Sequence, residues 1–273
     1  MLYLVATPIG NLGDITFRAI ETLKSCDYIL CEDTRHSLAL LNHFEIKKPL
    51  KSFHKFSEVG KEDDVVSDLK EGLVIALISD AGTPGISDPG TLLVQRCVSE
   101  GIAVQSIPGA CAAIAAISCS GLDTDRFQFC GFLPKKSKEL KTVLQEHLSY
   151  PGTTICYESP NRLIDVLTAI SELAADRPLV VARELTKKFE EVRRGTAQEL
   201  IAYWKDHILK GEIVLMISGQ KEVALDWATL SPEEHVQMLQ DTYSLNRNEA
   251  IKMAATLRGV PKRDIYNLFH REE

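Results

Sequence analysis

The sequence lacks the marks of a disulfide-bonded or metal-binding protein. Its seven cysteines are an odd number, they are scattered through apolar segments, and none are spaced as CxxC. Disulfide frameworks and structural zinc sites use paired, closely spaced cysteines, so the pattern argues against both. We therefore expect buried, reduced thiols in a cytoplasmic protein with no bound metal.

Long hydrophobic runs are also absent. No stretch approaches the roughly 18 apolar residues of a membrane-spanning helix. Residues 1–11 have neither a basic leader nor a small-residue cleavage site, so we expect no signal peptide. Positive charge is scarce as well, with 31 Lys and Arg against 38 Asp and Glu and a net charge of −7. Any contact with nucleic acid must therefore come from local basic patches rather than from the overall charge.

What remains is an ordinary globular composition. Of the 273 residues, 45% are hydrophobic and 25% are charged, which suits one large or two medium-sized domains. The first expected strand is not followed by GxGxxG, and no acidic residue ends the second strand at the usual place. Both absences argue against a nicotinamide-dependent dehydrogenase.

Residues 73–90, reading LVIALISDAGTPGISDPG, are the most informative stretch. The apolar run 73–78 is typical of a strand buried on both faces of a parallel sheet. Three glycines and two prolines then fall within residues 82–90, which predicts a loop whose backbone can approach a ligand closely. We expect Asp88 and Pro89 to cap and begin the next helix. A loop at this edge of an α/β sheet is a candidate ligand site, and an ordinary strand-to-helix connection is the alternative.

The chain up to residue 120 alternates between strand and helix patterns. Such alternation predicts an α/β fold with a doubly wound parallel sheet. We expect helices over 14–23, 37–43, 57–70, 89–100 and 108–119, between strands over 2–7, 28–31, 50–53, 73–79 and 102–107.

A polar, turn-prone stretch at 120–125 separates a second alternating unit from the first. We expect its helices over 139–148, 160–174 and 196–207, and its strands over 126–131, 153–157, 179–183 and 211–218. Beyond residue 220 the pattern is helical, with a capping box at Ser231, a helix over 246–257, a turn at Gly259 and a helix over 262–269. The predicted domains are 1–120 and 121–220, both α/β, and a helical tail over 221–273.

Nine short motifs occur in an order that resembles the tetrapyrrole methylase superfamily. Each is weak alone, but together they span most of the chain. They are ATPIGN (6–11), CEDTRHS (31–37), SDAGTPGISDPG (79–90), PGACAA (108–113), GFLP (131–134), YESPNRL (157–163), ARELTKKFEE (182–191), RRGT (193–196) and GEIVL (211–215).

The resemblance implies two α/β domains that bind S-adenosylmethionine in the cleft between them. Members that act on porphyrin-like substrates usually carry GxGPGD in the first loop and GDP in the central loop. Here the same places read ATPIGN and GTP (82–84), which favours the RNA-modifying branch. That branch implies methylation of a cytidine ribose 2′-hydroxyl in 16S ribosomal RNA by a homodimer without metal. A tetrapyrrole or other small acceptor is the alternative, and a non-catalytic RNA-binding protein is a third hypothesis.

The resemblance also assigns residues to the donor. The first loop would face it, and the central loop would hold its amino-acid and ribose parts. Residues of the PGACAA motif and Leu133, together with Leu185 or the turn at Gly211, Glu212 and Ile213, would enclose the adenine side. The residues so implied are Pro8, Ser79, Asp80, Ala81, Gly82, Thr83, Ile86, Cys111, Ala112, Leu133, Leu185, Gly211 and Ile213.

Two charged pairs that follow buried strands are candidates for the chemistry. A ribose hydroxyl is a poor nucleophile while protonated, so a base or a cation that favours the alkoxide should help. Glu184 and Lys187 follow one strand, and Asp33 and Arg35 follow another, where Glu32 belongs to the same polar cluster. The alternatives are a surface ion pair for the first pair and a helix cap with a salt bridge for the second. His36, His54 and the pair Glu158 and Arg162 are weaker candidates, and no single base stands out.

Substrate contact would need local positive charge. Lysines follow the GFLP motif, residues 183–194 carry five cations, and residues 246–271 carry six cations against two acids. The tail pattern resembles a helix-turn-helix module, although plain packing or dimer contacts would use the same pattern. For the other clusters, a solvated face of mixed charge is the alternative. The cations concerned are Lys135, Lys136 and Lys138, then Arg183, Lys187, Lys188, Arg193 and Arg194.

Overall fold

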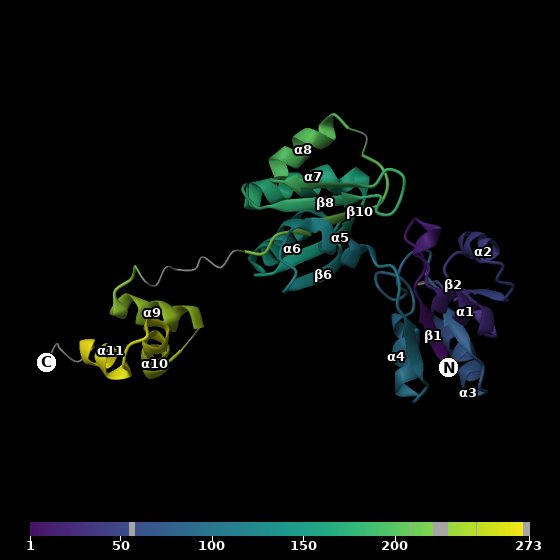
Figure 1. Ribbon diagram of the computed structural model, residues 1–273, viewed down its shortest axis with the longest axis horizontal. Helices are drawn as coiled ribbons and strands as arrows, with labels where there is room; N and C mark the ends of the chain where they lie inside the picture. The colour runs from purple at the N-terminus through teal and green to yellow at the C-terminus, as the bar shows by residue number, and fades with distance from the viewer. Residues whose placement is uncertain (55–57, 208, 221–228, 244, 270–273) are drawn as a thin grey trace. The chain divides into compact units, whose positions relative to one another are not determined.

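A computed structural model describes residues 1–54, 58–207, 209–220, 229–243 and 245–269 (Figure 1). The chain divides into two compact units, Met1–Gln220 and Lys221–Glu273. The first unit contains two five-stranded sheets, and the second contains helices alone among its described residues. Within the first unit, the separation into domains at residue 120 stays a prediction.

The first sheet is fully parallel, as the buried apolar runs predicted. Its strand order is β3-β2-β4-β1-β5. Successive residues of the central strand β4 belong to two different cores, since Ile75 and Leu77 pack on one face and Ala76 on the other. This is how a strand buried on both faces behaves. The strands are β1 (Leu2–Val5), β2 (Tyr28–Cys31), β3 (Leu50–Ser52), β4 (Ile75–Leu77) and β5 (Val104–Ile107).

Helices cover both faces of this sheet, which confirms the doubly wound arrangement. One face is covered by α3 (Glu58–Lys70) and α4 (Thr91–Ser99), which contribute Leu69 and Leu93 to the core. The other is covered by α1 (Phe17–Ser25) and α2 (Thr34–His43), which contribute Leu23 and Leu41. A short 3-10 helix, η1 (Leu12–Asp14), precedes α1.

Three helices around the first sheet begin at other residues than predicted, and the helix expected from residue 108 begins at Ala112. The first helix is capped by Thr16 rather than Asp14. The second helix is capped by Asp33 and begins at Thr34, three residues before the expected start at residue 37. The expected start at Asp88 and Pro89 is wrong, because α4 begins after Gly90, which has a φ of 124°. This backbone conformation strains any residue with a side chain, and a Cβ at Gly90 would also lie 2.6 Å from Leu77 Cδ2, so glycine is favoured there. The central loop therefore ends two residues later than predicted, and Asp88 lies within this loop rather than capping α4.

The second sheet is mixed rather than parallel. Its order is β6-β7-β10-β8-β9, and only β6 and β7 run parallel. The edge strand β9, reading EVRRG, was missed because charged residues on an edge strand do not give a buried-strand pattern. The strands are β6 (Phe127–Phe132), β7 (Thr153–Glu158), β8 (Leu179–Arg183), β9 (Glu191–Gly195) and β10 (Ile213–Ile217).

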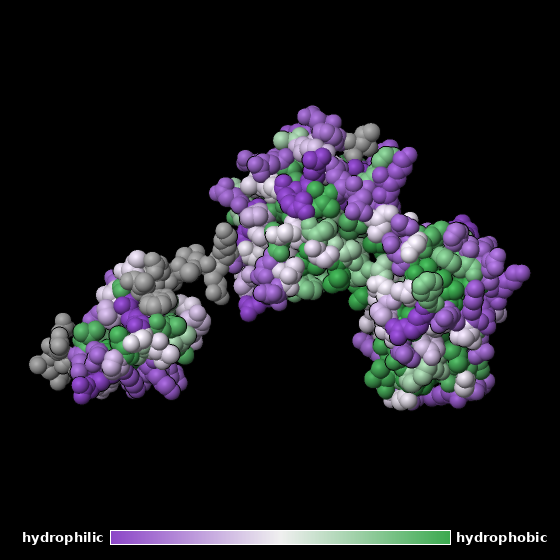
Figure 2. Space-filling view, viewed as in Figure 1, coloured by the Kyte–Doolittle hydropathy of each residue, from purple (hydrophilic) through white to green (hydrophobic). Residues whose placement is uncertain are grey.

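Three helices cover one face of the second sheet, and the apolar helix α5 (Ala112–Ser120) covers the other. By packing, α5 belongs with this sheet, although the predicted boundary at residue 120 follows it. Pro160 occupies the first turn of its helix as predicted. Figure 2 shows hydrophilic side chains over the outer surface of α8, the helix over Ala197–Lys205. The apolar face of this helix packs into the core through Leu200 and Trp204. The three helices are α6 (Ser137–Ser149), α7 (Pro160–Leu173) and α8 (Ala197–Lys205).

The second unit is a helical module with its own core. It consists of α9 (Pro232–Tyr243), α10 (Arg247–Arg258) and α11 (Lys262–Leu268), which pack around Leu239, Ile251 and Ile265. The capping box at Ser231 and the left-handed turn at Gly259 are confirmed. The helix-turn-helix pattern is therefore present, and its role stays a prediction.

All seven cysteines are free thiols. Four are buried and two are partly buried, whereas Cys119 is exposed, contrary to the expectation of buried thiols. Among the described residues, no helix combines the length and apolar character that crossing a membrane requires.

Candidate active site

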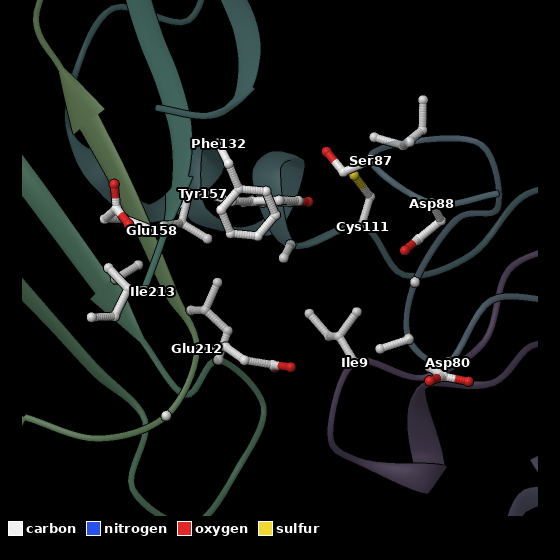
Figure 3. Close-up of a pocket in the computed structure, with 18 of the residues that line it drawn as sticks. Ile9, Asp80, Ser87, Asp88, Cys111, Phe132, Tyr157, Glu158, Glu212 and Ile213 are labelled. Atoms are coloured by element: carbon white, nitrogen blue, oxygen red, sulfur yellow. The ribbon is translucent and has the colours of Figure 1, made fainter. Parts of the chain in front are cut away.

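A cavity of about 440 Å³ opens where the loops of the first sheet meet the second sheet. This volume lies in the range of small-molecule sites. Figure 3 shows acidic side chains, Asp80 and Asp88, on one side of it, and Tyr157, Glu158 and Ile213 on the other. Residues far apart in the sequence thus form the walls of one site.

The central loop is held in place by the first loop. Thr7 and Gly82 form an antiparallel bridge, with N–H···O distances of 2.9 and 3.1 Å. The buried Ser79 hydroxyl donates toward the Ala81 and Gly82 carbonyls, at 3.3 Å each. Gly82 has a φ of 82°, a left-handed conformation that a side chain would strain. These contacts present the backbone of residues 80–83 to the cavity.

Three carboxylates, those of Glu32, Asp80 and Asp88, line the loop side of the cavity. Burial, reinforced by the charges of Glu32 and Asp80, raises the pKa of Asp88 to about 6. Burial and Asp80 also raise the pKa of Glu32. Such shifts arise when like charges share a partly desolvated site. A cation bound there would relieve the repulsion, so this side of the cavity favours a positively charged ligand group.

The opposite wall is mainly apolar. The rings of Phe132 and Tyr157 meet edge to face, with centroids 5.8 Å apart, and Ala182 and Ile213 lie on the neighbouring strands. Burial, with a smaller contribution from the nearby Cys111, raises the pKa of Tyr157 to about 12, so its hydroxyl stays protonated. This wall suits a flat aromatic group, which aromatic and aliphatic side chains can sandwich.

A second cavity, of about 300 Å³, adjoins the first. Lys187 lines it, and its Nζ lies 2.8 Å from Glu184 Oε1 and 3.0 Å from Glu212 Oε2. Burial alone lowers the pKa of Lys187, but its bonds with these two carboxylates outweigh that effect and raise the pKa. Lys187 is therefore a fixed ammonium ion at neutral pH.

The loop that carries Lys187 is strained. Glu184 and Thr186 have φ values of 51° and 67°, which are unusual for residues with side chains. A Cβ at Gly10 would lie 2.4 Å from Lys187 Cγ, and one at Gly211 would lie 2.3 Å from Glu184 Cδ. The two glycines therefore let the backbone close around the ion pair, which fixes the position of the ammonium group.

The structure brings most of the predicted donor residues together. Pro8 and Ser79 line the second cavity instead, and Leu133 lines neither, since it is buried and its carbonyl accepts a hydrogen bond from Arg162. Contact with a donor stays a prediction for all of them. The residues that line the first cavity are Asp80, Ala81, Gly82, Thr83, Ile86, Cys111, Ala112, Leu185, Gly211 and Ile213.

The predicted catalytic pairs differ in placement. Lys187 lines the second cavity, and Glu184 holds it there. Asp33 caps α2 and pairs with Arg35 at 2.9 Å, and the Arg35 side chain is 89% exposed. Neither of these two residues lines either of the two cavities, although the Asp33 backbone N–H donates to Asp80 Oδ1 at 3.2 Å, so the arrangement favours the cap and salt bridge that were the alternative. A catalytic role for the pair stays untested.

Glu158 and Arg162 have a structural arrangement. Their side chains lie 3.3 Å apart, and Arg162 also donates to the carbonyls of Leu133 and Pro134. This links the end of β7 and the start of α7 to the loop after β6, and so shapes the wall of the first cavity.

Some residues of the site escaped the sequence analysis. Asp88 was interpreted as a helix cap, and Glu212 only as part of a turn near the adenine. Glu212 lines both cavities. Its position directly before a buried strand was a usable signal, whereas Phe132 and Tyr157 gave none that separates a site from a core.

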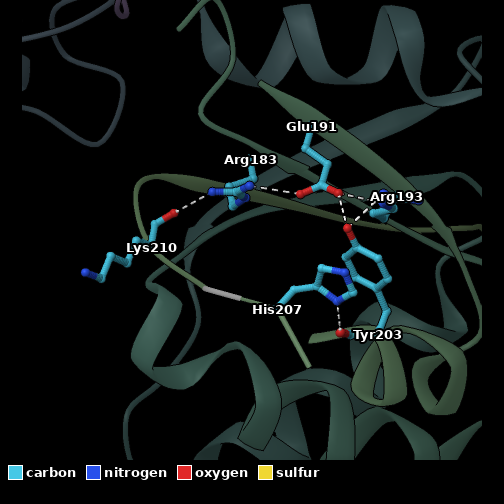
Figure 4. A network of polar contacts seen from close by, with 6 residues as sticks. All are labelled: Arg183, Glu191, Arg193, Tyr203, His207 and Lys210. Atoms are coloured by element: carbon cyan, nitrogen blue, oxygen red, sulfur yellow. Dashed lines mark hydrogen bonds and ion pairs between the residues drawn. The ribbon is translucent and has the colours of Figure 1, made fainter. Parts of the chain in front are cut away.

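Most of the arginines expected to contact substrate are engaged within the protein (Figure 4). Arg183 and Arg193 both pair with Glu191, at 2.9 and 2.6 Å, and Tyr203 joins the network. Arg194 donates to the carbonyl oxygens of Cys119 and Ser120, at the end of α5. These three arginines therefore tie β9 to its neighbours, and their contact with substrate stays a prediction.

Fold and site together describe an α/β protein with a cavity of small-molecule size where the loops of one sheet meet a second sheet. Residues 1–201 match the family of tetrapyrrole (corrin/porphyrin) methylases. The chain belongs to this family of methyltransferases. Solved structures of the same fold include a diphthine synthase, with a TM-score of 0.65 and 16% identity over 80% of this chain and 89% of that one. Another is the uroporphyrin-III-C-methyltransferase from Thermus thermophilus, with a TM-score of 0.57 and 20% identity over 84% of this chain and 98% of that one.

Curated relatives match over almost the whole chain. "Ribosomal RNA small subunit methyltransferase I" of Halalkalibacterium halodurans is 48% identical over 99% of this chain and 95% of its own length. The proteins of the same name from Bacillus subtilis and Synechocystis are 43% and 46% identical, over 99% and 98% of this chain and 94% and 96% of their own lengths. The similarity thus extends through the helical unit, beyond the residues that the family model matches.

Proposed function

We propose that this protein transfers a methyl group from S-adenosylmethionine to the 2′-hydroxyl of a cytidine ribose in 16S ribosomal RNA. The main support is the near full-length similarity to proteins named as small-subunit ribosomal RNA methyltransferases. The carboxylates and apolar side chains that line the first cavity also suit the binding of S-adenosylmethionine. The resemblance further implies a cytoplasmic homodimer that needs no metal.

The first cavity fits the donor chemically. S-adenosylmethionine supplies, when bound, a methyl group on a positively charged sulfonium. Asp80 and Asp88 would face its positive charges, and the backbone of residues 80–83 would hold its polar parts. Tyr157 and Ile213, from the apolar wall, would enclose the adenine. The lining of the first cavity consists mainly of backbone, carboxylates and apolar side chains. Such a lining suffices for methyl transfer, because this reaction mainly requires that donor and acceptor are held in line.

Mapping a radioactive label tests the proposal. The protein is incubated with tritiated donor and, separately, unmodified small ribosomal subunits, free 16S RNA, and a porphyrin. We expect label on a cytidine ribose of the RNA and none on the porphyrin. Label on the porphyrin would support the small-acceptor alternative, and the absence of both transfer and donor binding would support a non-catalytic RNA-binding protein.

Donor affinity should rise with pH through the pKa of Asp88, about 6. Protonated Asp88 is neutral and cannot offset the donor's positive charge, so affinity should fall about tenfold between pH 7 and pH 5 if the ionised form alone binds well. Isothermal titration calorimetry across this range measures the effect. Asp88→Asn should bind weakly at pH 7 and show a flatter profile, whereas Asp176→Asn, at an exposed acid, should match the wild type. Identical profiles for wild type and Asp88→Asn would contradict the assignment.

A further inference from the structure

The second cavity has a composition unlike the first. The first loop contributes Pro8 and Leu12, and α2 contributes His36, Ala39 and Leu40. Lys187, which packs against Gly10 of the first loop, and Glu212 add charged groups to the same cavity. The cavity thus combines an apolar side formed by Pro8, Leu12 and Leu40 with charged and hydrogen-bonding groups, a combination that suits a nucleoside with a flat base and a hydroxylated sugar.

The two cavities share a border. Ile9, Asp80, Ala81 and Glu212 line both of them. Methyl transfer needs the attacking oxygen and the methyl carbon about 3–3.5 Å apart and in line with the leaving sulfur. An acceptor that reacts with a ligand in the first cavity must therefore occupy a space that opens directly onto it, and the second cavity is such a space.

We propose that the second cavity holds the acceptor nucleoside, unstacked from the RNA, with its ribose at the border and its base against the apolar side. This inference rests on the proposed function. The base would lie on Leu12 and Leu40, and its ribose 2′-hydroxyl would face Glu212 and Lys187. Enzymes that modify single nucleotides commonly take them out of the stack in this way.

The position of Glu212 gives it a role in the transfer. The 2′-oxygen forms a bond to the methyl carbon while the carbon–sulfur bond breaks, and that bonding pair stays on sulfur. The hydroxyl proton passes to the Glu212 carboxylate, whose side chain is 73% exposed and can release it to water. Lys187, 3.0 Å from Glu212, stabilises the negative charge that develops on the oxygen.

Filling the second cavity tests the inference. Ala39→Trp places an indole in the cavity from an exposed position on α2. Leu38→Trp is the matched control, because Leu38 is exposed, lies about 100° further round the helix and lines neither cavity. For Ala39→Trp we expect donor affinity within about threefold of wild type and RNA methylation reduced at least about 100-fold. For Leu38→Trp, both quantities should stay close to wild type.

Three results would overturn it. Equal RNA methylation by the two tryptophan variants would show that the acceptor lies elsewhere, and loss of donor binding in Ala39→Trp would assign the cavity to the donor. Glu212→Gln, at an exposed side chain, adds an independent check: turnover should fall roughly 10²–10⁴-fold with donor affinity kept, and unchanged turnover would remove Glu212 from the reaction. If the wild type methylates no RNA although it binds the donor, the proposed function fails instead.

Discussion

Lys187→Ala is expected to lower the turnover number roughly 10²–10⁴-fold while donor affinity stays within about twofold. The reason is the placement of the ammonium group, which lines the second cavity and is held by Glu184 and Glu212. Without it, the developing alkoxide would lose its nearest positive charge. Because Lys187 does not line the first cavity, the donor should bind as before. Single-turnover methylation of small subunits and calorimetry with the donor measure the two quantities.

Lys188→Ala is the matched control. Lys188 is exposed and lies near Phe189, away from both cavities. Any effect there should appear in the Michaelis constant for RNA and not in turnover. Glu184→Ala should behave like Lys187→Ala, because the ammonium group loses its main support. Unchanged turnover in both Lys187→Ala and Glu184→Ala would remove this pair from the chemistry.

Ala112→Trp is expected to weaken donor binding about 100-fold or more, a loss of about 2.7 kcal/mol. Ala112 is the first residue of α5 and lines the first cavity, so an indole there would occupy the space proposed for the adenine. The fold should tolerate the change, since Ala112 is only partly buried. Calorimetry with S-adenosylmethionine or S-adenosylhomocysteine gives the dissociation constant.

Ile114→Trp controls for an indole on the same helix. Its side chain is 51% exposed, and it lines neither cavity. This variant should bind the donor like the wild type. Similar dissociation constants for Ala112→Trp and the wild type would mean that the donor does not occupy the first cavity.

The fold was predictable where one strong local signal decided it. The apolar run before Ser79 predicted a buried central strand, and Ser159 followed by Pro160 predicted a helix start. The predictions failed where tertiary contacts decide. Gly90 caps α4 because Leu77 leaves no room for a Cβ, and the charged strand β9 exists because β8 offers it a partner.

Part of the site was also predictable from local sequence signals. The pattern of the central loop itself predicted a ligand site at the edge of the sheet, whereas Cys111 was expected beside Asp80 only because the resemblance implied it. The mixed direction of the second sheet could not be read from strand patterns, because parallel and antiparallel strands have similar buried runs. Consequently the sequence did not reveal that Glu212, which precedes β10, lies between two cavities.

The paired arginines narrow the search for the RNA-binding surface. Arg183, Arg193 and Arg194 bind carboxylate or carbonyl partners within the protein, so their contribution to RNA affinity should be small. The exposed Lys136 pairs with Glu139. Within the helical unit, residues 246–271 carry six cations against two acids, and this segment is the better candidate for contact with RNA outside the two cavities.

Crystals soaked with S-adenosylmethionine test the central claim most directly. The predicted outcome is electron density for the donor in the first cavity, with its positively charged end near Asp80 and Asp88 and its methyl group directed toward Glu212. Density for the donor at another site, or a cavity filled by the protein's own side chains under saturating donor, would contradict the account.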